Sequence, residues 1–223
     1  MIIMAVPNKF ILYNYWRSSC SWRVRSVLEL KQIPYEYRPV NLVKGEQYSE
    51  EFRRLNPLNQ VPTLQVQTSD GHSEILHESM AIIDYLEQTF PTPSIYPKDP
   101  IERAKVITIA ETIVSGIQPI QNLSVGRKIE ELSDSKIRSG DWSREWIRMK
   151  FQKLEIFLKS MSGTHTFGNH LTLADFCLVP QVANAIRFKV DMNEFPLLKR
   201  LYEFLLTVEP IAKAQPSNQP DKQ

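Results

Sequence analysis

The chain reads FILYNYWRSSCSWRVR from residue 10 to residue 25. Its first four residues form an apolar run typical of a strand, and its second half opens a helix pattern. Between residues 18 and 25, three serines, one cysteine and two arginines therefore stand at a strand-to-helix turn. Because the N–H groups and the dipole of a helix start favour negative charge, we expect this turn to hold an anion, and a thiolate is a good candidate.

Strand and helix signals alternate through the first ninety residues. Residues 9–15 and 35–42 are typical of strands, and apolar residues at helical spacing predict a helix over 21–31 between them. Ser49 is followed by two acidic residues, which predicts the start of a second helix.

A proline-marked turn follows. Because proline is excluded from strand interiors, Pro62 directly before a strand pattern indicates a tight turn, and a cis peptide between Val61 and Pro62 is one way to make it. Asp70 and Gly71 then predict a hairpin, and a helix pattern begins at Ser79. The order is βαβ, then α, then a ββ hairpin, then α.

The second half has a different pattern. Several prolines crowd residues 91–99, which we interpret as a linker between a domain of residues 1–90 and an all-helical domain of residues 100–223. No strand signal is found beyond the linker, and the polar tail after Pro210 is expected to fray. The predicted fold class is α/β plus all-α.

Two helix starts in this half carry complete local signals. Asp99 at the N-cap is followed by Pro100 and Glu102, the residue types favoured in a first helical turn. Thr172 and Asp175 have the spacing of a capping box, so we interpret Asp175 as a folding signal without a chemical role.

Composition excludes several functions. The 223 residues carry a net charge of +2 with no dense basic face, which argues against nucleic-acid binding. Residues 1–7 are too short for a secretory signal, and no apolar run is long enough for a membrane helix. Two cysteines, Cys20 and Cys177, suit a reducing cytoplasm, and Cys177 lies in an apolar run expected in the core. The four histidines show no metal-ligand spacing, so no metal is expected.

Four segments carry a family resemblance: residues 18–25, 56–64, 116–124 and 178–190. Together they resemble the zeta class of soluble glutathione transferases, and the resemblance spans residues 9–215. It implies a thioredoxin-like N-terminal domain, a helical C-terminal domain, a homodimer, and glutathione as cofactor. It also implies glutathione-dependent isomerisation of maleylacetoacetate to fumarylacetoacetate, a reaction of tyrosine and phenylalanine catabolism, with α-halo acids as further substrates.

The resemblance also implies roles for single residues. Val61 pairs its backbone with the cysteinyl part of glutathione, Glu78 and Ser79 hold the γ-glutamyl end, and Gln47 reaches the glycyl side. The residues implied to contact glutathione are Ser18, Ser19, Cys20, Ser21, Trp22, Arg23, Gln47, Val61, Glu78, Ser79, Gln118, Asn122, Leu123 and Ser124. Ser18, Ser19 and Cys20 face the sulfur and form the catalytic group.

The thiol chemistry sets a requirement on the turn. A free thiol with a pKa of about 8.5 is only about 3% thiolate at pH 7, and lowering that pKa by two units requires about 2.7 kcal/mol. One hydrogen bond to the charged sulfur supplies about 1.5–3 kcal/mol, and a helix start adds up to about 1 kcal/mol. We assign Ser18 as the main donor, Ser19 as support and Ser21 as the helix cap.

Cys20 has two functional interpretations, tuning of the site or a nucleophile that forms a mixed disulfide. A dithiol enzyme needs a second cysteine three residues later, where this chain has Arg23, so a dithiol cycle is excluded and a monothiol reaction is not.

The substrate carries two carboxylates, and an enolate forms on addition of the thiolate, so cationic side chains are needed. The candidates are Arg17, Arg23, Arg25 and Arg187, and we assign carboxylate binding to Arg187. Arg25 is expected on an exposed helix face. Two alternatives stay open: a general glutathione transferase or thiol oxidoreductase acting through Cys20, and a non-catalytic module for protein assembly.

Overall fold

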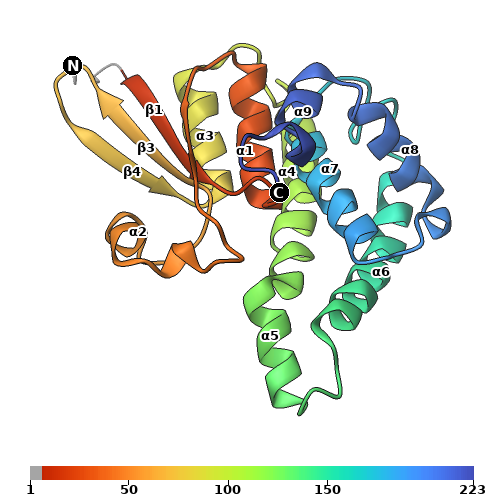
Figure 1. Ribbon diagram of the computed structural model, residues 1–223. Coiled ribbons are helices and arrows are strands. Elements are labelled where there is room, and N and C mark those ends of the chain that lie inside the picture. Colours follow the sequence, from red (N-terminus) through yellow and green to blue (C-terminus); the bar gives the residue numbers. More distant parts are fainter. Residues whose placement is uncertain (1–6) are drawn as a thin grey trace. The chain divides into compact units, whose positions relative to one another are not determined.

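The computed structural model describes residues 7–223 (Figure 1). The interpretation of residues 1–7 as too short for a secretory signal falls almost entirely outside these described residues. The chain forms two compact units. One contains the described residues up to Pro93 together with Pro210–Gln223, and the other is Ser94–Glu209. Within residues 7–223, no helix combines the length and apolar character that crossing a membrane requires.

The first unit is built on a four-stranded mixed sheet. Its strands are β1 (Pro7–Asn14), β2 (Glu36–Pro39), β3 (Thr63–Thr68) and β4 (Ser73–His77). They lie in the order β2-β1-β3-β4, with β2 parallel to β1 and both other pairs antiparallel. The βαβ-α-ββα order confirms the predicted thioredoxin-like fold.

The sheet carries helices on both faces. Helices α1 (Ser19–Leu30) and α3 (Ser79–Thr89) pack side by side, and α2 (Glu50–Leu55) follows the short turn η1 (Glu46–Tyr48). On one face of β1, Phe10 makes an edge-to-face contact with Phe90, the residue after α3. On the opposite face, Tyr13 makes an edge-to-face contact with Phe52 of α2. Because both faces are covered there, Phe10–Tyr13 of β1 form a continuous apolar run.

The turn before β3 is fixed by side-chain hydrogen bonds. The peptide bond between Val61 and Pro62 is cis, as the sequence suggested. The Asn56 amide donates to the carbonyl of Gln60 at 2.8 Å and to the hydroxyl of Thr63 at 2.9 Å. The predicted hairpin is also confirmed, since β3 and β4 pair antiparallel on either side of it.

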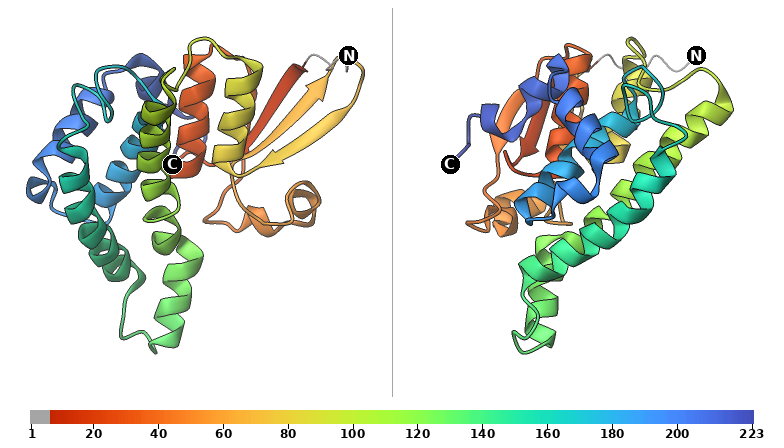
Figure 2. Two further views of the ribbon diagram at one scale, coloured as in Figure 1. Left: turned by 180° about the vertical axis from the view of Figure 1, so that it is seen from behind. Right: turned by 90° about the vertical axis from the view of Figure 1, so that its right-hand side faces the viewer.

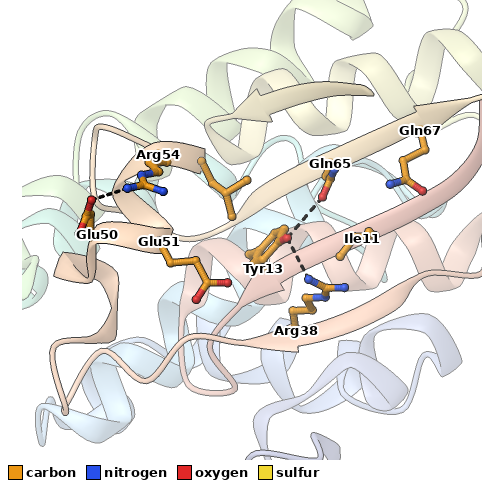
Figure 3. Close-up of a pocket in the computed structure, with 9 residues that line it drawn as sticks. Ile11, Tyr13, Arg38, Glu50, Glu51, Arg54, Gln65 and Gln67 are labelled. Atoms are coloured by element: carbon orange, nitrogen blue, oxygen red, sulfur yellow. Dashed lines mark hydrogen bonds and ion pairs between the residues drawn. The ribbon is translucent and has the colours of Figure 1, made fainter. Parts of the chain in front are cut away.

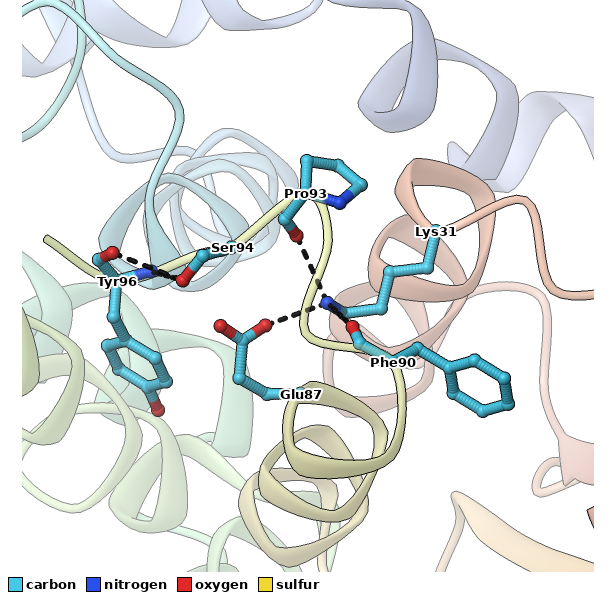
Figure 4. Close-up of polar contacts among 6 residues, drawn as sticks. All are labelled: Lys31, Glu87, Phe90, Pro93, Ser94 and Tyr96. Atoms are coloured by element: carbon cyan, nitrogen blue, oxygen red, sulfur yellow. Dashed lines mark hydrogen bonds and ion pairs between the residues drawn. The ribbon is translucent and has the colours of Figure 1, made fainter. Parts of the chain in front are cut away.

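A buried lysine ties the ends of two helices together (Figure 4). The Lys31 ammonium, at the C-terminal end of α1, contacts a Glu87 carboxylate oxygen of α3 at 2.7 Å. It also donates to the carbonyl oxygens of Phe90 and Pro93. The four groups form one charge-compensated cluster.

The C-terminal segment is ordered, so the expectation of a frayed tail is wrong. This segment contains helix α9 (Glu209–Ala214) and the turn η4 (Pro216–Asn218), and from Pro210 onward it belongs to the first unit, where it lies beside α1 (Figure 1). The carbonyl of Ile211 accepts a hydrogen bond from the Trp22 indole at 3.3 Å. Residues from Pro210 onward therefore pack with the sheet unit, although the sequence placed them with the helical half.

The second unit is all-helical, and Figure 2 shows its helices from two further sides. Its elements are α4 (Pro100–Val114), η2 (Gln118–Gln121), α5 (Leu123–Leu132), α6 (Ser139–Leu158), α7 (Leu173–Arg187), η3 (Met192–Glu194) and α8 (Pro196–Leu205). Helix α7 packs against both α4 and α8, and twelve of its residues are buried, so it forms the centre of this unit.

Both predicted helix starts of this unit are confirmed. The Asp99 carboxylate accepts the N–H groups of Ile101 and Glu102 at 3.0 and 2.8 Å. Thr172 and Asp175 form the reciprocal capping box. Burial raises the pKa of Asp175 above its ordinary value, although backbone N–H groups donate to both carboxylate oxygens.

Candidate active site

Ser18 caps α1 and keeps a hydrogen to donate. Helix α1 begins at Ser19, and the Ser18 Oγ accepts the N–H of Ser21 at 3.2 Å. Because the cap uses a lone pair of the hydroxyl oxygen, the hydroxyl hydrogen stays available to another acceptor. The assignment of Ser21 as the cap is therefore wrong: the helix begins two residues earlier than its apolar spacing indicated, and Ser21 is buried in the first turn.

Ser19 and Cys20 occupy the first turn of α1, and both side chains are partly exposed. The N–H groups of Ser18 and Ser21 are bonded to the Tyr15 carbonyl and to the Ser18 Oγ, whereas the Ser19 N–H has no hydrogen-bond partner among the described residues and can bind a negative ligand atom. The predicted catalytic group, Ser18 with Ser19 and Cys20, thus stands at a helix start with hydroxyl, thiol and amide groups together. This is an arrangement that favours a bound anion.

The next two residues of the motif point into the protein. Trp22 is 3% exposed, and Arg23 is 1% exposed with its guanidinium donating to the Ser79 hydroxyl at 2.8 Å. Arg23 of α1 therefore fixes the first residue of α3 through this hydrogen bond. Because its guanidinium is buried, Arg23 is not available at the surface to bind a substrate carboxylate. Arg25 is fully buried as well, which corrects the expectation of an exposed helix face.

Glu78 adopts an unusual backbone conformation at the start of α3. Its φ of 63° is uncommon for a residue other than glycine, and its side chain makes no capping bond and is exposed. Ser79 follows it as the buried first residue of α3. Such strained conformations are retained where the surrounding structure fixes them, often at ligand sites.

The sheet topology brings three predicted segments to one edge. Strands β1 and β4 run in the same direction because each is antiparallel to β3, and Tyr13, Thr63 and His77 are aligned across the three strands. The turn to Ser18 and the turn to Glu78 therefore leave the same edge of the sheet, where β3 begins. Ligands of open α/β sheets bind at this kind of edge.

Two further polar groups fit a peptide-like ligand. The Gln47 side chain is 7% exposed, and its Oε1 has no hydrogen-bond partner among the described residues. At Val61, before β3, neither the backbone N–H nor the carbonyl bonds to any described residue. An extended peptide can pair with such a free backbone segment as an added strand.

The remaining predicted residues lie in the helical unit. Gln118 begins η2, and Asn122 caps α5 by accepting the N–H of Leu123 at 2.8 Å. Ser124 follows in the first turn of α5, and both Leu123 and Ser124 are exposed. Arg187 ends α7, where its exposed guanidinium lies 4.4 Å from the ring centre of Phe188.

A pair of buried side-chain amides, which the sequence analysis did not single out, connects η2 with α7 in this unit. Gln121 of η2 and Gln181 of α7 each donate to the other's side-chain oxygen, at 3.1 and 2.9 Å. Both side chains are buried, and satisfied amides of this kind fix the packing of the elements that carry them. No local signal marks the pair, because its members are sixty residues apart.

A cavity of about 610 Å³ lies elsewhere in the first unit, between the sheet and α2 (Figure 3). Its charged groups are largely paired: Arg54 with Glu50, and Arg38 with the Tyr13 hydroxyl at 3.3 Å. None of the predicted site residues lines it. Among residues 7–223, no group of histidine, cysteine and acidic side chains is arranged to hold a metal ion.

Comparison with known proteins identifies the family. The sequence matches "Glutathione S-transferase, N-terminal domain" over residues 17–89 and "Glutathione S-transferase, C-terminal domain" over residues 128–214. The chain belongs to the glutathione S-transferase family, which confirms the family resemblance of its motifs.

Three similar proteins narrow the class. The maleylacetoacetate isomerase of Mus musculus is 46% identical over 216 residues, covering 96% of this chain and 95% of the relative. Glutathione S-transferase Z1 of Arabidopsis thaliana is 41% identical, covering 96% and 95%. The crystal structure of maleylacetoacetate isomerase from Anaeromyxobacter dehalogenans, with glutathione bound in the active site, superposes with a TM-score of 0.88 at 40% identity and covers 96% of this chain and 98% of its own.

Proposed function

We propose that this protein catalyses the glutathione-dependent cis-trans isomerisation of maleylacetoacetate to fumarylacetoacetate. Relatives at 40–46% identity over nearly the whole chain carry that activity in their names. The observation that carries the proposal is Ser18, which caps α1 through its oxygen and keeps its hydroxyl hydrogen for a thiolate. We place the enzyme in tyrosine and phenylalanine catabolism, as a cytoplasmic homodimer.

Glutathione is held by the first unit in this proposal. Val61 offers its free backbone groups to the cysteinyl part, and the buried, unpaired Gln47 oxygen accepts from the glycyl side. Glu78 and Ser79 receive the γ-glutamyl end at the start of α3, where Arg23 fixes the Ser79 hydroxyl.

Bound glutathione supplies a thiolate that adds to the cis double bond and, after rotation about the new single bond, leaves again. Ser18 donates its hydroxyl hydrogen to the sulfur, and the dipole of α1 at its N-terminal end adds to the stabilisation of the sulfur's charge. Ser19 supports this group from the first turn. The stabilisation lowers the free energy of the ionised thiol, so more nucleophile is present at neutral pH.

The carboxylates of the substrate need cations that reach solvent. Arg23 and Arg25 are buried, whereas Arg17 and Arg187 are exposed. We keep Arg187 as the residue that binds a substrate carboxylate. A second structure from Anaeromyxobacter dehalogenans, 39% identical with a TM-score of 0.86, contains dicarboxyethyl glutathione and citrate. A glutathione sulfur bonded to a carbon chain with two carboxylates supports a substrate of this class.

Thiol transfer through Cys20 is the second candidate function, because this side chain is partly exposed at a helix start. A pair of variants separates the two functions. We expect Ser18→Ala to lose isomerisation of maleylacetone, an analogue of the substrate, while Cys20→Ala retains most of it. If Cys20→Ala abolishes both isomerisation and thiol transfer and Ser18→Ala affects neither, the role given to Ser18 is wrong. A wild-type protein that transfers thiols but does not isomerise maleylacetone overturns the isomerase proposal.

A further inference from the structure

The turn between β1 and Ser18 is held by side chains from distant parts of the chain. The Tyr15 carbonyl accepts from the Ser18 N–H at 2.9 Å and from Arg25 at 3.3 Å, and the Trp16 carbonyl accepts from Arg25 at 3.0 Å. The Trp16 N–H donates to a carboxylate oxygen of Asp221 at 3.1 Å. Each backbone group named here thus has a partner that fixes it.

Arg25 joins this turn to the C-terminal segment. Its guanidinium is fully buried and also donates to the Ala214 carbonyl at 3.1 Å and to the Asn14 side chain at 2.8 Å. Burial lowers its pKa to about 10, which leaves it charged at neutral pH, and the nearby Asp221 carboxylate favours the charged form. A buried cation of this kind requires a fixed set of acceptors and an opposite charge.

Asp221 is itself anchored at the end of the segment. The Tyr37 hydroxyl of β2 donates to its second carboxylate oxygen. The side chain of Gln219 donates to the carbonyls of Lys213 and Gln215, both at 3.1 Å, which folds the segment onto α9. Asp221 therefore reaches the Trp16 amide from a fixed position, beside α1.

We propose that Asp221 is a positioning residue of the active site, which fixes the Trp16 peptide and thereby aims the Ser18 hydroxyl at the sulfur of bound glutathione. The proposal rests on the function assigned to Ser18 above. The path is short, because Ser18 lies two residues beyond Trp16 and its N–H bonds back to the Tyr15 carbonyl. A shift of the Trp16 peptide therefore moves the helix cap.

The first test measures the acidity of bound glutathione by the ultraviolet absorbance of its thiolate. Asp221→Asn preserves the size of the side chain but replaces one of its two acceptor oxygens with an amide nitrogen. Either the Trp16 N–H or the Tyr37 hydroxyl then loses its acceptor. We therefore expect the acid dissociation constant of the bound thiol to fall about tenfold, which is one pKa unit. Tyr37→Phe releases the anchor and leaves the carboxylate, and about a threefold loss is expected because only the position of the acceptor is relaxed. Lys222→Ala, an exposed neighbour, is the control and leaves the titration unchanged.

The second test needs no glutathione. Amide hydrogen exchange at Trp16 and Ser18 should accelerate at least about tenfold in Asp221→Asn, while exchange in β3 stays as in the wild-type protein. Unchanged bound-thiol titration in both Asp221→Asn and Tyr37→Phe, with glutathione still bound, overturns the positioning role. Failure of the wild-type protein to bind glutathione overturns the proposed function itself, and the exchange rates then still report on the contact between Asp221 and Trp16.

Discussion

At the scale of the residue, Ser18 combines two tasks in one hydroxyl. Its oxygen accepts the Ser21 N–H and so sets where α1 begins, and its hydrogen is left for a ligand. The cap fixes the position of the oxygen before any ligand arrives. In the proposed function, a thiolate meets a donor whose oxygen is already in place, which reduces the ordering cost of binding.

Removal of the Ser18 hydroxyl should make bound glutathione less acidic. We expect Ser18→Ala to raise the pKa of its thiol by about 1–2 units, because a hydrogen bond to a charged group contributes about 1.5–3 kcal/mol. Ultraviolet titration of the thiolate measures this shift. Ser18→Thr, which retains cap and hydroxyl, should restore most of the acidity, and Ser69→Ala in an exposed turn is the control. An unaltered titration in Ser18→Ala would remove Ser18 from this role.

Arg187 should matter for charged substrates only. We expect Arg187→Ala to lower kcat/KM for a dicarboxylate substrate by about 10- to 100-fold, the range for loss of one charge-assisted hydrogen bond, and to spare a neutral electrophile. Steady-state kinetics with both substrates tests this. Arg103→Ala is a matched control, since Arg103 is also exposed and stacks on a ring, that of Tyr96. Equal losses on both substrates would contradict carboxylate binding.

At the scale of the element, local signals predicted helix starts well where one residue dominates. Ser49, Asp99 and Thr172 each cap the helix that the sequence indicated. The start of α1 was misplaced by two residues, because three serines compete there and the apolar spacing begins only after the last. β2 is shorter than predicted, since the chain turns at Asn41, whose side chain accepts the N–H groups of Val43 and Lys44.

The Lys31 cluster should contribute strongly to stability. Lys31→Met leaves the Glu87 carboxylate largely buried without its cation, and we expect a loss of about 3–5 kcal/mol in the free energy of unfolding. Denaturant titration measures this loss. Arg54→Met breaks the exposed pair with Glu50 and should cost less than about 1 kcal/mol. Similar losses of unfolding free energy in the two variants would show that burial does not strengthen the contribution of the Lys31–Glu87 pair to stability.

Tyr35 should make the fold weaker at alkaline pH. Burial raises its pKa from 10.0 to about 12, so between these values the folded protein binds more protons than the unfolded chain. The free energy of unfolding therefore falls as pH rises through this window, and below pH 10 the phenol contributes no pH dependence. Tyr35→Phe should fall less steeply than the wild-type protein between pH 10 and 12, as measured by urea unfolding at each pH. Parallel curves would contradict the shift.

At the scale of the whole molecule, the order of elements, the thioredoxin-like sheet and the family were readable from the chain. The place of the C-terminal segment was not. Arg25 and Ala214 are 189 residues apart, and the polar residues near Asp221 have the composition of a free tail. Burial of Arg25 depends on that distant contact, so a helix pattern alone placed it at the surface.

The unpaired groups at Val61 and Gln47 were expected only through the family resemblance, because the hydrogen-bonding state of a backbone segment depends on the neighbouring strands and not on its own residues. The same reasoning holds for Glu78, whose positive φ is fixed by the junction between β4 and α3. Sequence could therefore name the chemistry of the site, and the fold was needed to place three of its segments at one edge.

In the proposed reaction, glutathione acts as a cofactor that is returned unchanged. The most direct test of this role mixes the purified protein with maleylacetone in large excess over glutathione and follows both the trans product and the free thiol. We expect complete conversion to the trans isomer, with the thiol concentration unchanged at the end. Loss of one thiol for each maleylacetone consumed, or no conversion when glutathione is bound, would contradict it.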